Sequence, residues 1–93
     1  MGDDPGRFLK RELTVRKLSA NRLSLDIGVP SGRVSDILNC RRAITADTAV
    51  RLGLYFGNSA QFWLDLQSQY DIAVVEREKG AELATRVRPA VVA

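Results

Sequence analysis

The 93-residue sequence predicts an all-α fold of five helices in a single domain. Apolar residues recur at spacings of three and four in five successive segments, which is the periodicity of half-buried helices. Residues that can cap or stop a helix stand at the ends of these segments. With 45% apolar and 27% charged residues, the chain is large enough for one core without disulfides or metals.

The first predicted helix begins at Asp4 and Pro5, because aspartate caps free amides and proline is accepted in the first helical turn. We expect it to end near residues 14 and 15, which are β-branched. Its inward side carries Phe8, Leu9 and Leu13. Its surface carries Arg7, Lys10 and Arg11, for which we favour a solvated face over phosphate contact.

Residues 19 to 39 predict two short helices joined by a tight turn. The first of them runs from Ser19, its expected N-cap, to about residue 27, with an inward side made of Ala20, Leu23 and Ile27. Gly28 can take the left-handed conformation that ends a helix. The second begins at Pro30 or Ser31, where the serine would cap the free amides, and has one narrow apolar stripe: Val34, Ile37 and Leu38.

The face opposite that stripe is short, polar and mostly uncharged. At about 100° per residue it carries Gly32, Asp36 and Asn39, with Arg33 and Ser35 beside it. A helix face that contacts only solvent usually carries Lys and Glu. Small polar side chains and one Arg instead suit a helix that enters a DNA groove. The stretch therefore predicts a helix-turn-helix, with a plain solvated helical hairpin as the alternative.

Residues 40 to 57 predict an exit loop and a fourth helix. Cys40 stands where a left-handed glycine is common, so it either takes that strained conformation or marks a different turn. Arg41 and Arg42 suit DNA phosphates and could lower the pKa of the thiol, although no second cysteine could resolve a redox intermediate. Thr45 should cap the fourth helix, which Gly57 ends. Its wide apolar arc predicts the central core helix: Ala49, Val50, Leu52, Leu54 and Phe56.

The fifth helix should run from about residue 59 to 79, with Gly80 as its stop. One side carries Phe62, Trp63, Leu66, Tyr70, Ala73 and Val74, and Leu64 adds apolar surface on another side. This exceeds what a core of this size needs, so we expect a homodimer through Leu64, Tyr70 and Val74, with Trp63 in the core. The alternative is that Phe62 and Trp63 only complete the core. Residues 1 to 79 would form the DNA-binding domain, and residues 80 to 93 a loosely ordered tail.

Composition and charge exclude several classes of function. The chain has no histidine and one cysteine, so an internal disulfide, the usual zinc sites and Ser-His or Cys-His catalysis are excluded. We expect no metal, no cofactor and no enzymatic activity. Apolar stretches are too short to span a membrane and the acidic N-terminus is not a signal peptide, which predicts a cytoplasmic protein. Residues 1 to 57 hold ten basic and six acidic residues, a balance that suits a polyanion.

Residues 18 to 72 resemble the HigA-type antitoxins of the Xre/Cro repressor family, also called virulence-associated protein I. The family pattern combines N-G-K/R-R-x-I-T-A-D-T-A-x-R-L with F-G-x-S-x-x-F-W-L-x-L-Q-x-x-Y-D. It is carried here by Asn39, Arg41, Arg42, residues 44 to 49, Arg51, Leu52, Phe56, Gly57, Ser59, residues 62 to 64, Leu66, Gln67, Tyr70 and Asp71. The chain departs from the pattern at three positions: Cys40 for glycine, Gly32 for a frequent Arg, and Ala20 where Gln often clamps a phosphate.

The resemblance implies a lambda-repressor-like domain that binds double-stranded operator DNA as a homodimer, represses its own operon and neutralises a HigB-type mRNA endonuclease. In that reading the base contacts fall on Gly32, Arg33, Asp36 and Asn39. The phosphate contacts fall on Ser19, Asn21, Ser31, Arg41 and Arg42. Two alternatives remain: a stand-alone regulator without a toxin, and a protein-interaction module that no longer binds DNA. A small basic reading frame in the same operon, and titration with the promoter, would separate the three.

Overall fold

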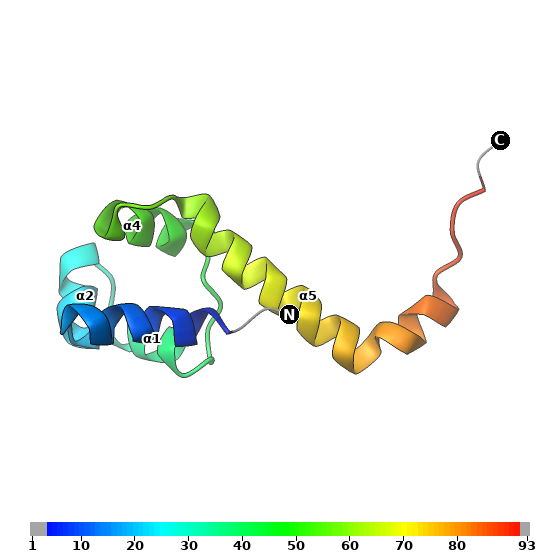
Figure 1. Cartoon of the computed structure of the whole chain (residues 1–93), viewed down its shortest axis with the longest axis horizontal. Coiled ribbons are helices and arrows are strands. Elements are labelled where there is room, and N and C mark those ends of the chain that lie inside the picture. The colour runs from blue at the N-terminus through cyan, green and yellow to red at the C-terminus, as the bar shows by residue number, and fades with distance from the viewer. Residues whose placement is uncertain (1–3, 92–93) are drawn as a thin grey trace.

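The computed structural model describes residues 4 to 91, and over that range the chain forms five α-helices and no strand (Figure 1). The helices are α1 (Pro5–Arg16), α2 (Ala20–Ile27), α3 (Ser31–Leu38), α4 (Ala46–Phe56) and α5 (Ala60–Arg86). The predicted all-α fold class is confirmed. Because α5 extends well beyond the other four helices, the molecule is elongated, 54 Å by 26 Å by 22 Å.

Four of the five helices begin with a side-chain cap, and three of these caps are the ones that the sequence predicts. At α1, Asp4 Oδ1 accepts a hydrogen bond from the Gly6 N–H at 2.6 Å. Hydroxyl oxygens cap α2, α4 and α5 at 3.0 to 3.4 Å, from Ser19, Thr45 and Ser59. The start of α3 is the exception, because Pro30 is its N-cap and no side chain caps it. The expected serine cap at Ser31 is therefore wrong.

Two helix ends also differ from prediction. Helix α1 continues to Arg16 and ends at Lys17, whose left-handed backbone (φ 57°) lets its N–H reach the carbonyls of residues 13 and 14. Helix α5 passes through Gly80 and ends at Arg86. A glycine inside a helix costs only about 1 kcal/mol relative to alanine, and strong helix formers on both sides offset it. The predicted start of a loose tail at residue 80 is therefore wrong for residues 80 to 86, and residues 92 and 93 lie outside the described range.

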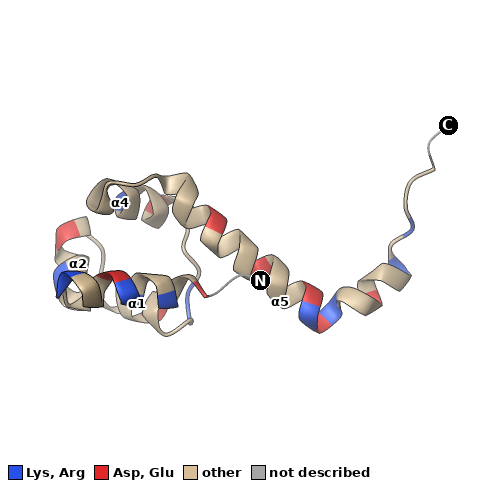
Figure 2. Cartoon of the chain, viewed as in Figure 1, with Lys and Arg blue, Asp and Glu red and all other residues tan. Residues whose placement is uncertain are grey.

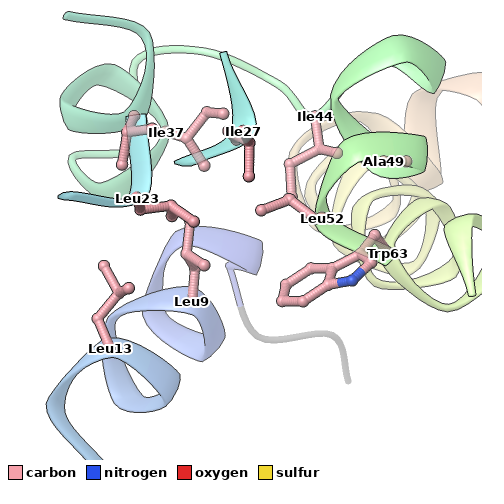
Figure 3. Close-up of a cluster of buried hydrophobic side chains, with 10 residues drawn as sticks. Leu9, Leu13, Leu23, Ile27, Ile37, Ile44, Ala49, Leu52 and Trp63 are labelled. Atoms are coloured by element: carbon pink, nitrogen blue, oxygen red, sulfur yellow. The ribbon is translucent and has the colours of Figure 1, made fainter. Parts of the chain in front are cut away.

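The core lies where α1, α2 and α3 meet α4 and the start of α5 (Figure 3). Ten apolar residues are buried there: Leu9, Leu13, Leu23, Ile27, Val34, Ile37, Ile44, Ala49, Leu52 and Trp63. Trp63 is fully buried, as predicted, and its indole N–H donates to Asn58 Oδ1 at 2.8 Å. Its ring lies 5.5 to 5.6 Å from three other rings, those of Phe8, Phe56 and Phe62. Trp63 thus joins α1, α4 and α5.

Helix α4 buries one side rather than the wide arc that the sequence predicts. Ala49 and Leu52 are buried, but Val50 is 49% and Leu54 is 82% exposed. Val50 and Leu54 lie one turn apart on the side of α4 that faces away from the core. The prediction that they belong to the core is wrong.

Candidate nucleic-acid interface

Helices α2 and α3 form the predicted helix-turn-helix. Gly28 takes the left-handed conformation (φ 73°), and the N–H groups of Gly28 and Val29 both donate to the Ser24 carbonyl at 3.0 Å. Val34 and Ile37 are 1% and 2% exposed, so they fix which side of α3 faces the core. The opposite side of α3 is consequently free to face a partner.

The residues predicted to contact bases differ in how open they are. Gly32 and Asn39 are exposed, and a Cβ added at Gly32 would meet nothing within 4 Å. Asp36 is half-buried, and one of its carboxylate oxygens lies 3.5 Å from Arg41 Nε. The structure therefore brings the predicted base residue Asp36 together with the predicted phosphate residue Arg41. This ion pair orients the carboxylate and partly neutralises it.

Arg33 lies beside this outward face and is half-buried. Its Nε is buried and has no hydrogen-bond partner among residues 4 to 91. Leaving a buried donor unpaired costs about 1 to 3 kcal/mol, so folding alone does not account for an arginine at this position.

The residues predicted to contact phosphates lie at the start of α2, at the start of α3 and in the loop after α3. All five are exposed: Ser19, which also caps α2, Asn21, Ser31, Arg41 and Arg42. Because no side chain caps α3, the free N–H groups of its first turn remain available to an anion beside Ser31. Lys and Arg positions, blue in Figure 2, lie along the ribbons of α1 and α2.

Cys40 takes the first of its two predicted alternatives, the left-handed conformation (φ 61°). The expected lowering of its pKa by neighbouring arginines is wrong. The Asp4 carboxylate accepts a hydrogen bond from the thiol and raises the pKa of Cys40, and partial burial raises it further, while Arg7 opposes both effects. The thiol is therefore protonated at neutral pH and is a poor nucleophile.

Replacing Cys40 with glycine should raise the free energy of unfolding by about 1 kcal/mol, since glycine relieves the left-handed strain. Lys17→Gly is the matched control, because Lys17 has the same backbone conformation (φ 57°) at the end of α1. Urea denaturation measures both. If Lys17→Gly raises the free energy of unfolding and Cys40→Gly lowers it, the contact between the thiol and Asp4 outweighs the strain.

Arg51 is a structural residue of this site that sequence reasoning did not single out. Its Nη1 donates to the Ile27 carbonyl at 2.7 Å and to the Gly28 carbonyl at 3.3 Å, and its Nε donates to Asp47 Oδ1 at 2.7 Å. A positive charge is stabilising at the C-terminal end of a helix, where unpaired carbonyl groups carry partial negative charge. One turn later on α4, the Tyr55 hydroxyl donates to Asp26 at 2.9 Å. Helix α4 thereby holds the end of α2 and the turn into α3.

Arg51→Gln should lower the free energy of unfolding by about 1 kcal/mol, a modest loss because the Arg51 side chain is 39% exposed. Amide hydrogen exchange at Gly28 and Val29 should accelerate, since their turn loses its tie to α4. Arg86→Gln is the control, because it breaks a surface ion pair with Glu82 (4.0 Å) at the end of α5. Equal exchange rates in the two variants would contradict the role of Arg51.

Gln67 is a second such residue, and it anchors the loop that carries Arg41 and Arg42. Its Oε1 accepts a hydrogen bond from the Ile44 N–H at 2.8 Å, and its Nε2 donates to Asp71 at 2.9 Å. Both Arg51 and Gln67 belong to the family pattern, but no local signal indicates that their partners lie 24 and 23 residues away, respectively.

Two other features, a metal-binding cluster and a membrane-spanning helix, are absent from the described part of the chain. Residues 4 to 91 contain no group of three or more Cys, Asp or Glu side chains placed to hold a metal ion. None of the five helices is both long and apolar enough to cross a membrane.

Comparisons with known proteins agree with this geometry. No protein-family model matches the chain. Virulence-associated protein I of Dichelobacter nodosus is 43% identical over 76 residues, which cover 81% of this chain and 70% of that protein. A HigA-family addiction module antidote protein from Coxiella burnetii superposes with a TM-score of 0.91 and 42% identity, over 96% of this chain and 98% of the other.

A further solved structure shows a similar protein together with DNA. The antitoxin HigA of Pseudomonas aeruginosa, solved with the higBA promoter, is 36% identical, with a TM-score of 0.91 over 98% of this chain and all of that one. Sequence and fold therefore agree over nearly the whole length. The chain belongs to the HigA-type family of helix-turn-helix antitoxins.

Proposed function

We propose that this protein is the antitoxin of a type II toxin-antitoxin system, which binds the operator of its own operon as a homodimer and represses it. It also neutralises a HigB-type mRNA endonuclease encoded beside it. The observation that carries the proposal is the small, polar outward face of α3, held on a turn that Arg51 ties to α4. The relative solved with its promoter has the same fold.

In this proposal the N-terminal half of α3 enters the major groove of the DNA. Arg33 donates to O6 and N7 of a guanine, while Asp36 or Asn39 contacts cytosine or adenine. Gly32 lets the helix backbone approach the bases closely, because its Cα is open to solvent. Ser19, Asn21, Ser31, Arg41 and Arg42 hold phosphates on either side.

A dimer is required because one helix-turn-helix contacts only one half-site. Helix α5 is the element that can join two copies, since its C-terminal half extends away from α2 and α3 (Figure 1). Three apolar residues there are 58%, 46% and 37% exposed: Ile72, Val75 and Leu83. Of the predicted interface residues, Leu64 is half-buried against the core, and Tyr70 and Val74 are half-buried as well. We therefore extend the proposed interface to the outer side of α5.

Ile72→Glu and Val74→Glu should each shift the protein from dimer to monomer, because each puts a charge into an apolar two-fold contact. Analytical ultracentrifugation measures the mass after circular dichroism has confirmed the fold. Leu54→Glu is the control, since Leu54 is apolar and 82% exposed but lies on α4. If both α5 variants remain folded dimers, dimerisation involves another surface.

Two experiments test the proposed function. Footprinting on the promoter of its own operon should reveal two protected half-sites about one DNA turn apart, as two α3 helices in a symmetric dimer require. Coexpression with the neighbouring small reading frame should restore growth that this frame alone arrests. Two half-sites without any rescue of growth would favour the alternative, a regulator that has no toxin partner.

A further inference from the structure

A basic groove lies between α1 and the end of α3. It measures about 790 Å³ and is lined by Arg7, Lys10, Arg11, Thr14, Val15 and Leu38. None of these lining residues is acidic. A face that is only solvated usually pairs its cations with acids three or four residues away. Four residues after Arg7 and Lys10 stand Arg11 and Thr14, and Asp4, three residues before Arg7, uses its carboxylate to cap α1. Glu12, the acid within this stretch, pairs instead with Arg16.

The groove adjoins the outward face of α3. Gly6 brings α1 against the last turn of α3 so closely that an added Cβ would overlap the Ile37 carbonyl oxygen. Leu38 forms the wall of the groove on the α3 side. At 100° per residue, Leu38 lies between the buried side of α3 and the outward side that carries Ser35 and Asn39. The groove therefore opens beside the face that the proposed function aims at DNA.

We propose that this groove holds the DNA backbone that flanks the major groove entered by α3, so that α1 forms a second phosphate-binding element. The inference rests on the proposed function. Arg7 and Lys10 are the residues proposed to contact the phosphates. They lie one helical turn apart, and this distance matches the spacing of neighbouring phosphates on a DNA strand to within a few ångström. Thr14 already donates to the Lys10 carbonyl at 2.9 Å, and Arg11 lies 6.0 Å over the Phe8 ring, so neither is required.

The test is the double variant Arg7→Gln/Lys10→Gln in the full chain, after circular dichroism confirms the fold. Its binding to its own promoter fragment and to a random duplex of equal length is measured over a series of KCl concentrations. The slope of log K against log salt should fall by about 2, since each phosphate contact contributes about 1. Affinity should fall by the same factor on both duplexes.

The control is Arg77→Gln/Lys79→Gln, which removes the same charge from the far part of α5 and should leave the slope unchanged. An unchanged slope in the α1 variant overturns the inference. The inference also fails if the α1 variant keeps its salt slope but no longer neutralises the toxin, because the groove would then hold an acidic protein segment. The wild-type chain tests the proposed function separately: if it does not prefer its promoter, that function fails, whatever the slopes are.

Discussion

Trp63→Ala should lower the free energy of unfolding by about 3 to 5 kcal/mol, the range for deleting a large aromatic side chain from a core. Trp63 is fully buried, packs edge-on or tilted against three rings, and satisfies its indole N–H through Asn58. The alanine variant loses all of these contacts and leaves a cavity where α1, α4 and α5 meet. A domain of this size is stable by about 5 to 15 kcal/mol, so much of its stability would be lost.

Urea denaturation followed by circular dichroism measures this loss. Leu54→Ala is the control, since a residue that is 82% exposed should change stability by no more than about 0.5 kcal/mol. Trp63→Phe should fall between the two, because it keeps most of the ring contacts but leaves Asn58 without its donor. A loss below about 1 kcal/mol for Trp63→Ala would contradict the central place of this residue.

Arg33→Ala should weaken binding to the promoter by about 1 to 3 kcal/mol, and relax specificity at one base position. A bidentate contact with guanine accounts for a loss of that size, while binding to random DNA should change much less. Competition titrations on promoter duplexes that vary a single base pair identify the position.

Arg33→Lys is the matched variant, because lysine keeps the positive charge but cannot form the bidentate pair. It should lose most of the specificity and keep the affinity for random DNA. Equal losses on promoter and random DNA in both variants would assign Arg33 to a phosphate instead.

Local chemistry explains which features of the fold could be predicted from the sequence. Capping by Asp4, Ser19, Thr45 and Ser59 depends on neighbouring residues, and so does the left-handed turn at Gly28. The end of α5 could not be predicted in this way, because Gly80 weakens a helix by less than its neighbours strengthen it. The burial of α4 likewise depends on where α5 packs, which leaves Val50 and Leu54 outside.

The same distinction between local and long-range interactions applies to the candidate site. The helix-turn-helix and the face of α3 follow from periodicity within about twenty residues. The ties made by Arg51 to Ile27 and by Gln67 to Ile44 span 24 and 23 residues, so only the folded chain reveals them. The pKa of Cys40 was predicted in the wrong direction for the same reason: Arg41 and Arg42 are its neighbours in sequence, whereas Asp4 is its neighbour in space.

In the proposed function, α3 reads the sequence of a DNA operator. The most direct measurement compares the dissociation constants for a duplex of its own promoter and for a random duplex of equal length, at one physiological salt concentration. If α3 reads the operator sequence, the promoter should bind at least about 10³-fold more tightly, as specific regulators do. Equal affinity for the two duplexes would contradict it.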